Sequence, residues 1–319
     1  MSPLRVAVIG AGFFGSRHVQ NYAALEGAEL VAVCDADRAM AEAATGRYGG
    51  EAIADPETLL GRVDAVSIAT PTASHHPLGR MFLDAGIGVL VEKPMTRTLA
   101  EADDLIAAAA RSGAVLQTGH LERFNGAYAE VCAQARSPRL IVARRIAPFR
   151  PRGTDVSVVL DLMIHDIDLV LALAGSAPEE VSAIGGSVFS PTDDFAQATL
   201  RFAGGCIASI TASRVATVTE RVLSVHTADR VMTADLGTSK LQIAHRDIAA
   251  DGAEAEVVTD EHAFTHGNTL ARQLESFLAA VRGEAPVVVD GKAGRAALDV
   301  ALAIIARIAE GSRIGGQTP

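Results

Sequence analysis

The 319-residue sequence lacks several features that whole classes of protein need. It contains no tryptophan, and aromatic residues make up only 4% of it, so it offers few rings on which single-stranded nucleic acid could stack. Its 28 lysines and arginines are outnumbered by 38 aspartates and glutamates, which gives a formal net charge of −10. This acidic balance argues against broad binding to nucleic acid or anionic membranes, although it allows a local basic pocket.

Cysteine is scarce, and long apolar runs are missing. Cys34, Cys132 and Cys206 are far apart and odd in number, so we expect neither a disulfide framework nor a zinc site. They fit a reducing, cytoplasmic location, and the segment MSPLRVAVIG has no signal-peptide pattern. Charged residues interrupt every apolar stretch before it reaches about 18 residues, so we expect no membrane span.

The composition that remains is globular, with 49% hydrophobic and 21% charged residues. At about 150 residues per domain, the length suggests two domains. Over residues 1–120, short apolar runs alternate with helix-like segments, which predicts βαβ units and a doubly wound parallel sheet. The predicted strands are Leu4–Ile9, Leu30–Cys34, Val63–Ala69, Val89–Val91 and Ala114–Thr118. Thr98 and Glu101 predict a capping box at the start of one helix.

The pattern changes near residue 120. Val156–Ala174 predicts one long apolar helix, and the short runs after it predict an open, mainly antiparallel sheet in an α+β domain over 121–319. These runs are Val181–Ile184, Ala196–Phe202, Cys206–Thr211, Arg221–His226, Val231–Asp235 and Lys240–Ala244. Thr269–Val281 and Ala293–Ala309 predict amphipathic helices, the last of which could pack back on the first domain.

Residues 10–15, GAGFFG, form a GxGxxG motif between a predicted strand and a predicted helix. Gly10 permits the tight turn, Gly12 lets the backbone approach a pyrophosphate, and Gly15 lets the helix meet the strand, as in Rossmann domains. The alternative is a turn that binds nothing, but a strand, a helix and a downstream acid are all in place. We include Phe13 and Phe14 in the predicted cofactor-binding set.

The downstream acid is Asp35, at the end of the second predicted strand. A carboxylate there can hold the adenosine ribose hydroxyls and repel a 2′-phosphate, so NAD is favoured over NADP. Arg38 lies close enough in sequence to soften that preference.

Glu92, Lys93 and Pro94 follow the fourth predicted strand, at the sheet edge where ligands bind in such folds. Lys93 could hydrogen-bond a reacting oxygen, or it could be a surface lysine in an X-Pro turn. The Lys93–Pro94 bond is a candidate for cis geometry.

After the third predicted strand, Thr70, Pro71 and His75 are expected to line the same cofactor cleft with Glu92 and Lys93. His75 and His76 lack a third ligand at a sensible spacing, so we expect no metal.

Asp161, His165 and Asp168 interrupt an otherwise apolar helix. At about 100° per residue, His165 lies about 40° from Asp161 and Asp168 about 20° on the other side, so the three share one stripe. Acids are rarely buried unpaired, so the stripe must face a partner, water or a ligand. An aspartate beside a histidine can orient the ring and raise its pKa towards the working range of an acid–base catalyst. A satisfied His–Asp pair in the core is the alternative, and we expect Asp166 to point elsewhere, to solvent or a cap.

Four cations gather just before this helix: Arg144, Arg145, Arg150 and Arg152. They could receive a phosphate or carboxylate of a substrate. A solvated strand edge is an equally open interpretation.

The sequence resembles the glucose–fructose oxidoreductase/inositol dehydrogenase/MocA (Gfo/Idh/MocA) family over essentially the whole chain. The resemblance rests on a series of motifs in a fixed order: GAGFFG, Asp35, ATPTASHH, EKPM, QTGHLERFN and DLMIHDID. The resemblance implies NAD-dependent oxidation of a secondary alcohol on a sugar, cyclitol or nucleotide sugar. It also implies dimers or tetramers assembled through the second sheet.

By the same resemblance, Lys93 lies near the nicotinamide and the reacting hydroxyl, His165 is the general acid–base, and Asp161 is its neighbour and a substrate contact. Arg123 borders the substrate pocket. We group with it, as further substrate-binding residues, Asn125, Arg152 and Asp168.

Val158 and Val159 stand where many members have a glycine pair, and the preceding stretch, RIAPFRPR, is basic and contains proline. This resembles a subgroup that oxidises nucleotide sugars, with the 3-hydroxyl of a UDP-N-acetylhexosamine as the expected target. Two alternatives remain: a glycosidase that retains NAD and oxidises its substrate transiently, and a non-catalytic dinucleotide-binding sensor. Reduction of another substrate class, such as a dihydrodiol or bilin, would suit NADPH better than Asp35 allows.

Overall fold

The computed structural model describes residues 2–151, 153–247, 256–264 and 267–314. The chain divides into two compact units, Met1–Leu121 with Gly267–Leu298, and Glu122–His266 with Asp299–Pro319. We predicted a single boundary near residue 120. The structure instead assigns α7 (Thr269–Val281) to the first unit, where its Leu270, Leu274 and Phe277 are buried in a core.

The first unit contains a six-stranded sheet in the order β3-β2-β1-β4-β5-β6, and every neighbouring pair is parallel. Its strands are β1 (Leu4–Ile9), β2 (Ala28–Cys34), β3 (Glu51–Ile53), β4 (Ala65–Ile68), β5 (Gly88–Val91) and β6 (Leu116–Thr118). The strand order reverses beside β1, as in a Rossmann fold. The predicted doubly wound sheet is therefore confirmed, although β3 was not among the predicted strands.

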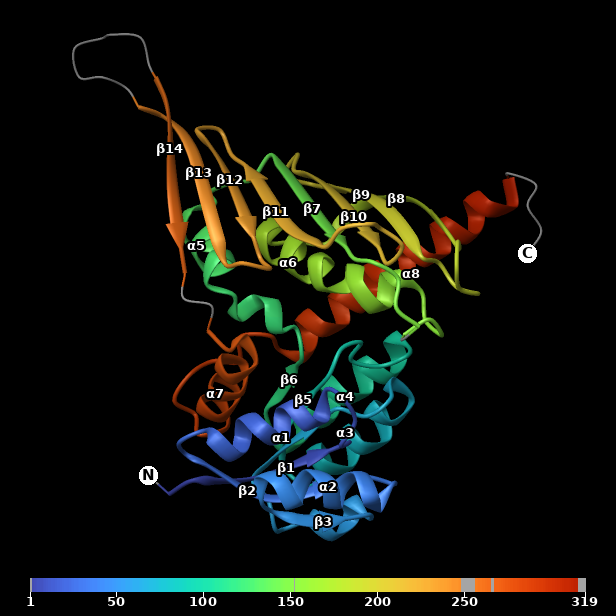
Figure 1. Cartoon of the computed structure of the whole chain (residues 1–319), viewed down its shortest axis with the longest axis vertical. Coiled ribbons are helices and arrows are strands. Elements are labelled where there is room, and N and C mark those ends of the chain that lie inside the picture. The colour runs from blue at the N-terminus through green and yellow to red at the C-terminus, as the bar shows by residue number, and fades with distance from the viewer. Residues whose placement is uncertain (1, 152, 248–255, 265–266, 315–319) are drawn as a thin grey trace. The chain divides into compact units, whose positions relative to one another are not determined.

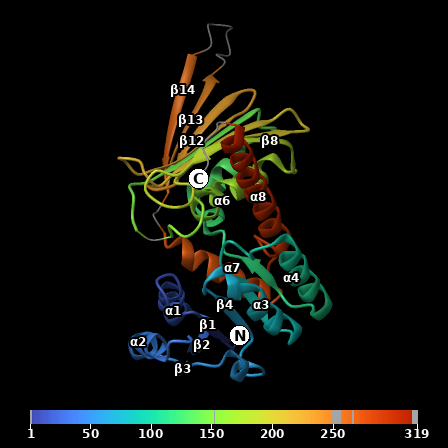
Figure 2. The same cartoon turned by 90° about the vertical axis from the view of Figure 1, so that its right-hand side faces the viewer.

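Helices cover both faces of this sheet (Figure 1 and Figure 2). One face packs on α1 (Gly15–Ala24), α2 (Arg38–Tyr48) and α7, and the other on α3 (His75–Asp84) and α4 (Leu99–Ser112). Short 3₁₀ turns, η1 (Pro56–Leu59) and η2 (Thr72–Ser74), lie in the connections. The predicted capping box is present, since the Thr98 hydroxyl and the Glu101 carboxylate satisfy each other's backbone amides.

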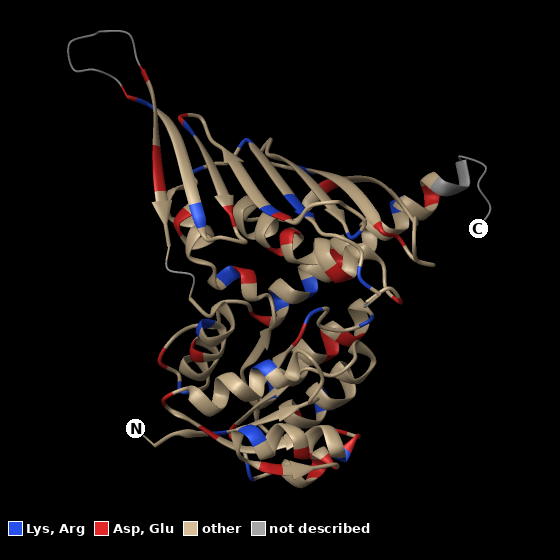
Figure 3. Ribbon diagram, viewed as in Figure 1, with Lys and Arg blue, Asp and Glu red and all other residues tan. Residues whose placement is uncertain are grey.

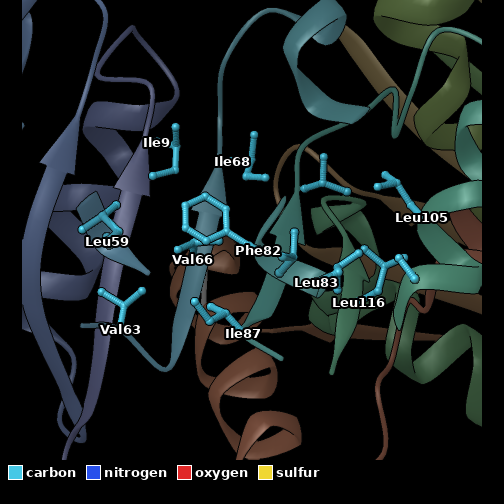
Figure 4. Packing of buried hydrophobic residues seen from close by; sticks show 14 of the residues in the cluster. Ile9, Leu59, Val63, Val66, Ile68, Phe82, Leu83, Ile87, Leu105 and Leu116 are labelled. Atoms are coloured by element: carbon cyan, nitrogen blue, oxygen red, sulfur yellow. The ribbon is translucent and has the colours of Figure 1, made fainter. Parts of the chain in front are cut away.

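The core follows from strand alternation. Val6 and Val8 face one set of helices, whereas Ala7 and Ile9 face the other. Figure 4 shows the second side, where Ile9 and Ile68 from the strands lie with Phe82 of α3 and Leu105 of α4. Each such burial contributes about 1.5–3 kcal/mol, so the sheet is a rigid base for the loops at its carboxyl edge.

The second unit is built on an eight-stranded sheet in the order β14-β13-β12-β11-β7-β10-β9-β8. Only the β7–β10 pair is parallel, and the other neighbouring pairs are antiparallel. Its strands are β7 (Leu140–Ile146), β8 (Pro178–Gly186), β9 (Phe195–Phe202), β10 (Ile207–Ser213), β11 (Glu220–His226), β12 (Arg230–Asp235), β13 (Lys240–Asp247) and β14 (Glu256–Ala263). The predicted open, mainly antiparallel sheet is confirmed.

Helices α5 (Gly126–Gln134) and α6 (Ile164–Ala174) pack on one face of this sheet (Figure 1). A 3₁₀ turn, η3 (Leu121–Phe124), comes before α5, and α8 (Gly291–Ile314) ends the described chain. The long helix expected over 156–174 is instead a π-helical turn, η4 (Val159–Met163), followed by α6.

Candidate active site

The glycine-rich turn between β1 and α1 has the geometry that its sequence predicts. Gly10 adopts φ +95°, and a Cβ there would lie 2.7 Å from the Ala69 carbonyl oxygen. A Cβ at Gly15 would lie 1.8 Å from the Gly10 carbonyl oxygen, whereas one at Gly12 would meet no atom within 4 Å. Gly10 and Gly15 are therefore needed to close the turn, and Gly12 leaves space above it at the N-terminus of α1. A pyrophosphate fits this arrangement.

Asp35 follows β2 and is tied to this turn. Its carboxylate accepts the Ala11 N–H at 2.6 Å and the Asp37 N–H at 2.9 Å. Because a carboxylate has about four acceptor sites, it retains capacity for ribose hydroxyls. Arg38, at the start of α2, is exposed and forms a 2.8 Å ion pair with Glu42.

The two phenylalanines of the motif differ in setting. Phe13 is 58% exposed, and the Arg17 guanidinium lies 4.6 Å from its ring centroid. Phe14 contacts the ring of His18, with centroids 5.7 Å apart.

Thr70 and Pro71 follow β4, and Thr70 Oγ1 is buried without a hydrogen bond to any described residue. A bound cofactor's polar atom would satisfy it. The His75 ring is buried, with its Nε2 2.9 Å from the Thr70 carbonyl oxygen and its Nδ1 3.0 Å from that of Pro94. Burial lowers the pKa of His75. The imidazole thus joins two loops at the sheet edge, and its predicted contact with the cofactor stays a prediction.

Lys93 is the second residue after β5 and is half-buried. It precedes a cis peptide bond to Pro94, which confirms the expected cis geometry. The adjacent Glu92 is 7% exposed, and its carboxylate lies 3.1 Å from His18 Nε2 and accepts the Lys93 N–H at 3.3 Å. A Cβ at Gly119 would lie 2.7 Å from that carboxylate. The sequence analysis missed His18, whose signal is a histidine on the buried face of the helix that begins at Gly15.

Asp161 and His165 belong to the second unit and are both half-buried. Asp161 lies in the π-helical turn and His165 in the first turn of α6. A Cβ at Gly153 would lie 3.2 Å from Asp161 Oδ2, so the backbone at Gly153 borders this carboxylate. Single π-turns inside helices are frequent at functional sites.

Asp168, predicted to lie on one stripe with Asp161 and His165, faces a partner within the protein. It is 1% exposed and forms a bidentate pair with Arg123, whose Nε and Nη2 donate at 2.6 and 2.8 Å. The π-turn lies before α6, so it changes the position of Asp161 relative to His165 and Asp168 but not the spacing between the last two. Pairing with Arg123 allows the Asp168 carboxylate to be buried. Arg123 and Asp168, both predicted to bind substrate, are therefore engaged with each other.

Asn125, another predicted substrate contact, is 3% exposed and caps α5. Its side-chain oxygen accepts the Ala127 N–H at 3.0 Å, and its nitrogen donates to the Leu236 carbonyl oxygen at 2.9 Å. The side chain joins α5 to the segment after β12, which is a structural task.

Arg145 and Asp166 overturn two further expectations. Arg145 is 4% exposed and donates to Asp166 at 2.8 and 3.0 Å and to Glu122 at 2.9 Å. Asp166, expected in solvent or at a cap, is 1% exposed, and burial raises the pKa of its carboxyl against the effect of Arg145.

The four arginines therefore do not form one cluster. Arg144 points to the opposite face of β7 from Arg145 and pairs with Glu220. Arg150 is exposed, and Arg152 lies outside the described residues. In each unit, basic residues are interspersed with acidic ones (Figure 3).

The described residues contain no group of three or more histidine, cysteine, aspartate or glutamate side chains that could hold a metal ion. Among the same residues, no helix is long and apolar enough to cross a membrane.

Comparisons with known proteins agree with these features. Residues 4–120 match a family model described as "Oxidoreductase family, NAD-binding Rossmann fold", and residues 123–231 match the GFO/IDH/MocA C-terminal domain. The chain is 36% identical over 306 residues to UDP-N-acetylglucosamine 3-dehydrogenase of Acidithiobacillus ferrooxidans, which covers 95% of this chain and 97% of that one. It is 28% identical to inositol 2-dehydrogenase of Rhizobium meliloti, over 98% of both chains.

A solved structure of the A. ferrooxidans enzyme superimposes with a TM-score of 0.88 at 35% identity, over 97% of this chain and 98% of that chain. The fold of both units is thus shared with this enzyme over nearly the full length of the two chains. The chain belongs to the Gfo/Idh/MocA oxidoreductase family, and it is an NAD-dependent dehydrogenase.

Proposed function

We propose that this dehydrogenase oxidises a nucleotide sugar, with the 3-hydroxyl of a UDP-N-acetylhexosamine as its target. The observation that carries the proposal is the full-length likeness, at 36% identity and a TM-score of 0.88, to an enzyme named for that reaction on UDP-N-acetylglucosamine. Identity to the inositol dehydrogenase is lower, at 28%. A sugar or cyclitol without a nucleotide is therefore the second choice.

The described residues fit NAD. Gly12 leaves space for the pyrophosphate, Asp35 keeps acceptor sites for the ribose, and Thr70 Oγ1 offers an unsatisfied polar atom. Bound NAD supplies the nicotinamide ring that accepts a hydride from the substrate carbon. Glu92 and His75 hold the loop that carries Lys93.

The protein's own part of the chemistry is proton transfer and charge stabilisation. His165 removes the proton of the substrate hydroxyl as general base. Asp161, four residues earlier, orients the imidazole. Lys93 is the proposed hydrogen-bond donor that stabilises negative charge developing on a substrate oxygen.

The test follows reduced nicotinamide by absorbance while purified protein and NAD are offered UDP-N-acetylglucosamine, myo-inositol and glucose separately. Turnover with the nucleotide sugar, and little with the other two, is the expected result. Turnover with myo-inositol or glucose alone would contradict the proposed substrate. Product formation without net reduced nicotinamide would instead indicate the retained-cofactor glycosidase.

We also propose that the protein is a cytoplasmic homo-oligomer. Its three cysteines are free, as expected in a reducing compartment. The face of the eight-stranded sheet opposite α6 exposes apolar side chains, and a second copy of the chain is the occupant we propose for it. These side chains are Val142, Ile184, Phe195 and Ile207.

A further inference from the structure

We infer that Arg214, a buried arginine in the second unit, is a positioning residue that fixes residues 153–158 against the carboxylate of Asp161. We call residues 153–158 the strap. The inference rests on the proposed function, in which Asp161 orients His165.

Arg214 directly follows β10 and is 4% exposed. Its Nη1 donates to the carbonyl oxygens of Gly153 at 2.7 Å and Val156 at 2.9 Å, both in the strap. Its Nη2 donates to the hydroxyls of Ser190 at 2.9 Å and Thr192 at 2.7 Å. Nε donates to Asp194 at 2.8 Å. A guanidinium has five N–H donors, so this side chain joins three segments through its full capacity.

Asp194 fixes the guanidinium from the other side. It directly precedes β9 and is fully buried. Its Oδ2 accepts the N–H groups of Val188, Phe189 and Ser190 at 2.6–3.0 Å, and Oδ1 accepts the Ser190 hydroxyl at 2.6 Å. Burial by itself raises the pKa of the Asp194 carboxyl. These hydrogen bonds and the Arg214 guanidinium nevertheless hold that pKa well below its usual range. The carboxylate is therefore a permanent anchor for Arg214.

The strap has further bonds to the same loop. The Thr192 hydroxyl lies within hydrogen-bond distance of the Thr154 and Val156 carbonyl oxygens, at 3.1 and 2.9 Å. The Ser157 hydroxyl donates to Asp193 at 2.9 Å. These contacts account for the carbonyl oxygens of Gly153, Thr154 and Val156, none of which belongs to a helix or strand.

The strap leads directly to Asp161. The Asp161 N–H donates to the Ser157 carbonyl oxygen at 3.1 Å, and Gly153, at φ +71°, approaches the Asp161 carboxylate from the side. Replacing a buried ion pair with apolar residues often costs no stability, so conformational specificity is one reason to retain it. In this protein, the conformation that the ion pair specifies is that of the strap beside Asp161.

The test compares Arg214→Lys with Thr192→Val. Lysine keeps the charge but concentrates three donors on one nitrogen, so it cannot span the same partners. Valine removes the threonine hydroxyl and leaves the Arg214–Asp194 pair. In both variants we expect kcat/KM for the sugar substrate to fall about tenfold to a hundredfold, since a misplacement of about 1 Å can cost a hundredfold. The Kd for NAD should stay within about twofold of wild type.

A second readout needs no substrate. Hydrogen exchange of the backbone amides over 154–161 should accelerate in both variants. The matched control is Leu241→Ala, which truncates a fully buried side chain in β13 of the same unit. It should lower the Tm by creating a cavity and leave exchange over 154–161 as in wild type.

Wild-type exchange in the strap of both variants would overturn the inference, as would losses of kcat/KM no larger than that of Leu241→Ala. If Arg214→Lys fails to fold, Thr192→Val still decides. Failure of the proposed function is a different result, namely no turnover by the wild-type protein, and strap exchange then tests the inference by itself.

Discussion

At the residue scale, His165 carries the largest functional expectation. His165→Ala should reduce kcat by at least about a hundredfold, because general acid–base catalysis contributes on that scale. The Kd for NAD should hardly change, since His165 and the glycine-rich turn belong to different units. Steady-state kinetics and cofactor titration measure both quantities.

His76→Ala is the matched control, because His76 pairs with Asp104 at 2.8 Å on the α3–α4 surface. It should leave kcat near the wild-type value. Unchanged turnover in His165→Ala would remove the acid–base role from that residue.

Asp35 is the residue that we expect to select between the two nicotinamide dinucleotides. Asp35→Ser should weaken NAD binding about tenfold or more, since it removes charge-assisted hydrogen bonds, and it should improve NADP binding by removing a repulsive charge. Calorimetric Kd values for both cofactors measure the change in preference.

Asp37→Ser controls for helix capping, because Asp37 is the N-cap of α2. Because serine caps helices about as well as aspartate, that variant should leave both the Tm and the NAD/NADP ratio near wild type. Equal loss of both cofactors in Asp35→Ser would refute ribose binding by Asp35 and leave only its bonds to Ala11 and Asp37.

At the scale of elements, the effects of substitutions on stability and on NAD binding can be separated in the β1–α1 turn. Gly15→Ala should lower the Tm strongly, since its Cβ would overlap the Gly10 carbonyl oxygen at 1.8 Å. Gly12→Ala should keep a near wild-type Tm, since no atom lies within 4 Å, and still weaken NAD binding by occupying the pyrophosphate space. Thermal unfolding and NAD titration of both variants test this. A Gly12→Ala protein that binds NAD as tightly as wild type would contradict it.

The π-turn before α6 shows why element-level prediction failed in one place. The apolar run over 156–174 indicates a helix, and a helix is there, but local spacing does not reveal an extra residue in one turn. That residue changes which polar side chains share a face. The pairing of Asp168 with Arg123 and of Asp166 with Arg145 could not be predicted either, because the partners are 45 and 21 residues apart.

At the scale of the whole molecule, the proposed contact between copies rests on the exposed sheet face. Ile184 in β8 is 65% exposed and lies opposite Gln197 of β9. Ile184→Lys should shift the protein towards monomers, since a desolvated, unpaired charge is costly in an interface. Light scattering after size exclusion measures the mass. Leu60→Lys, at the end of η1 in the first unit, is the control and should change nothing. A monomeric wild type would contradict the proposal.

The sequence by itself determined the parts whose causes are local. Strand alternation, glycine spacing and capping residues act within a few positions, so the two sheets, the dinucleotide turn, the capping box before α4 and the cis bond after Lys93 were predicted. The tertiary structure alone decided which charges are buried together. It paired His18 with Glu92, Arg123 with Asp168 and Arg145 with Asp166, and it gathered Arg214, Asp194 and the strap. Buried ion pairs need partners from distant segments, and only the folded chain brings those segments within hydrogen-bond distance.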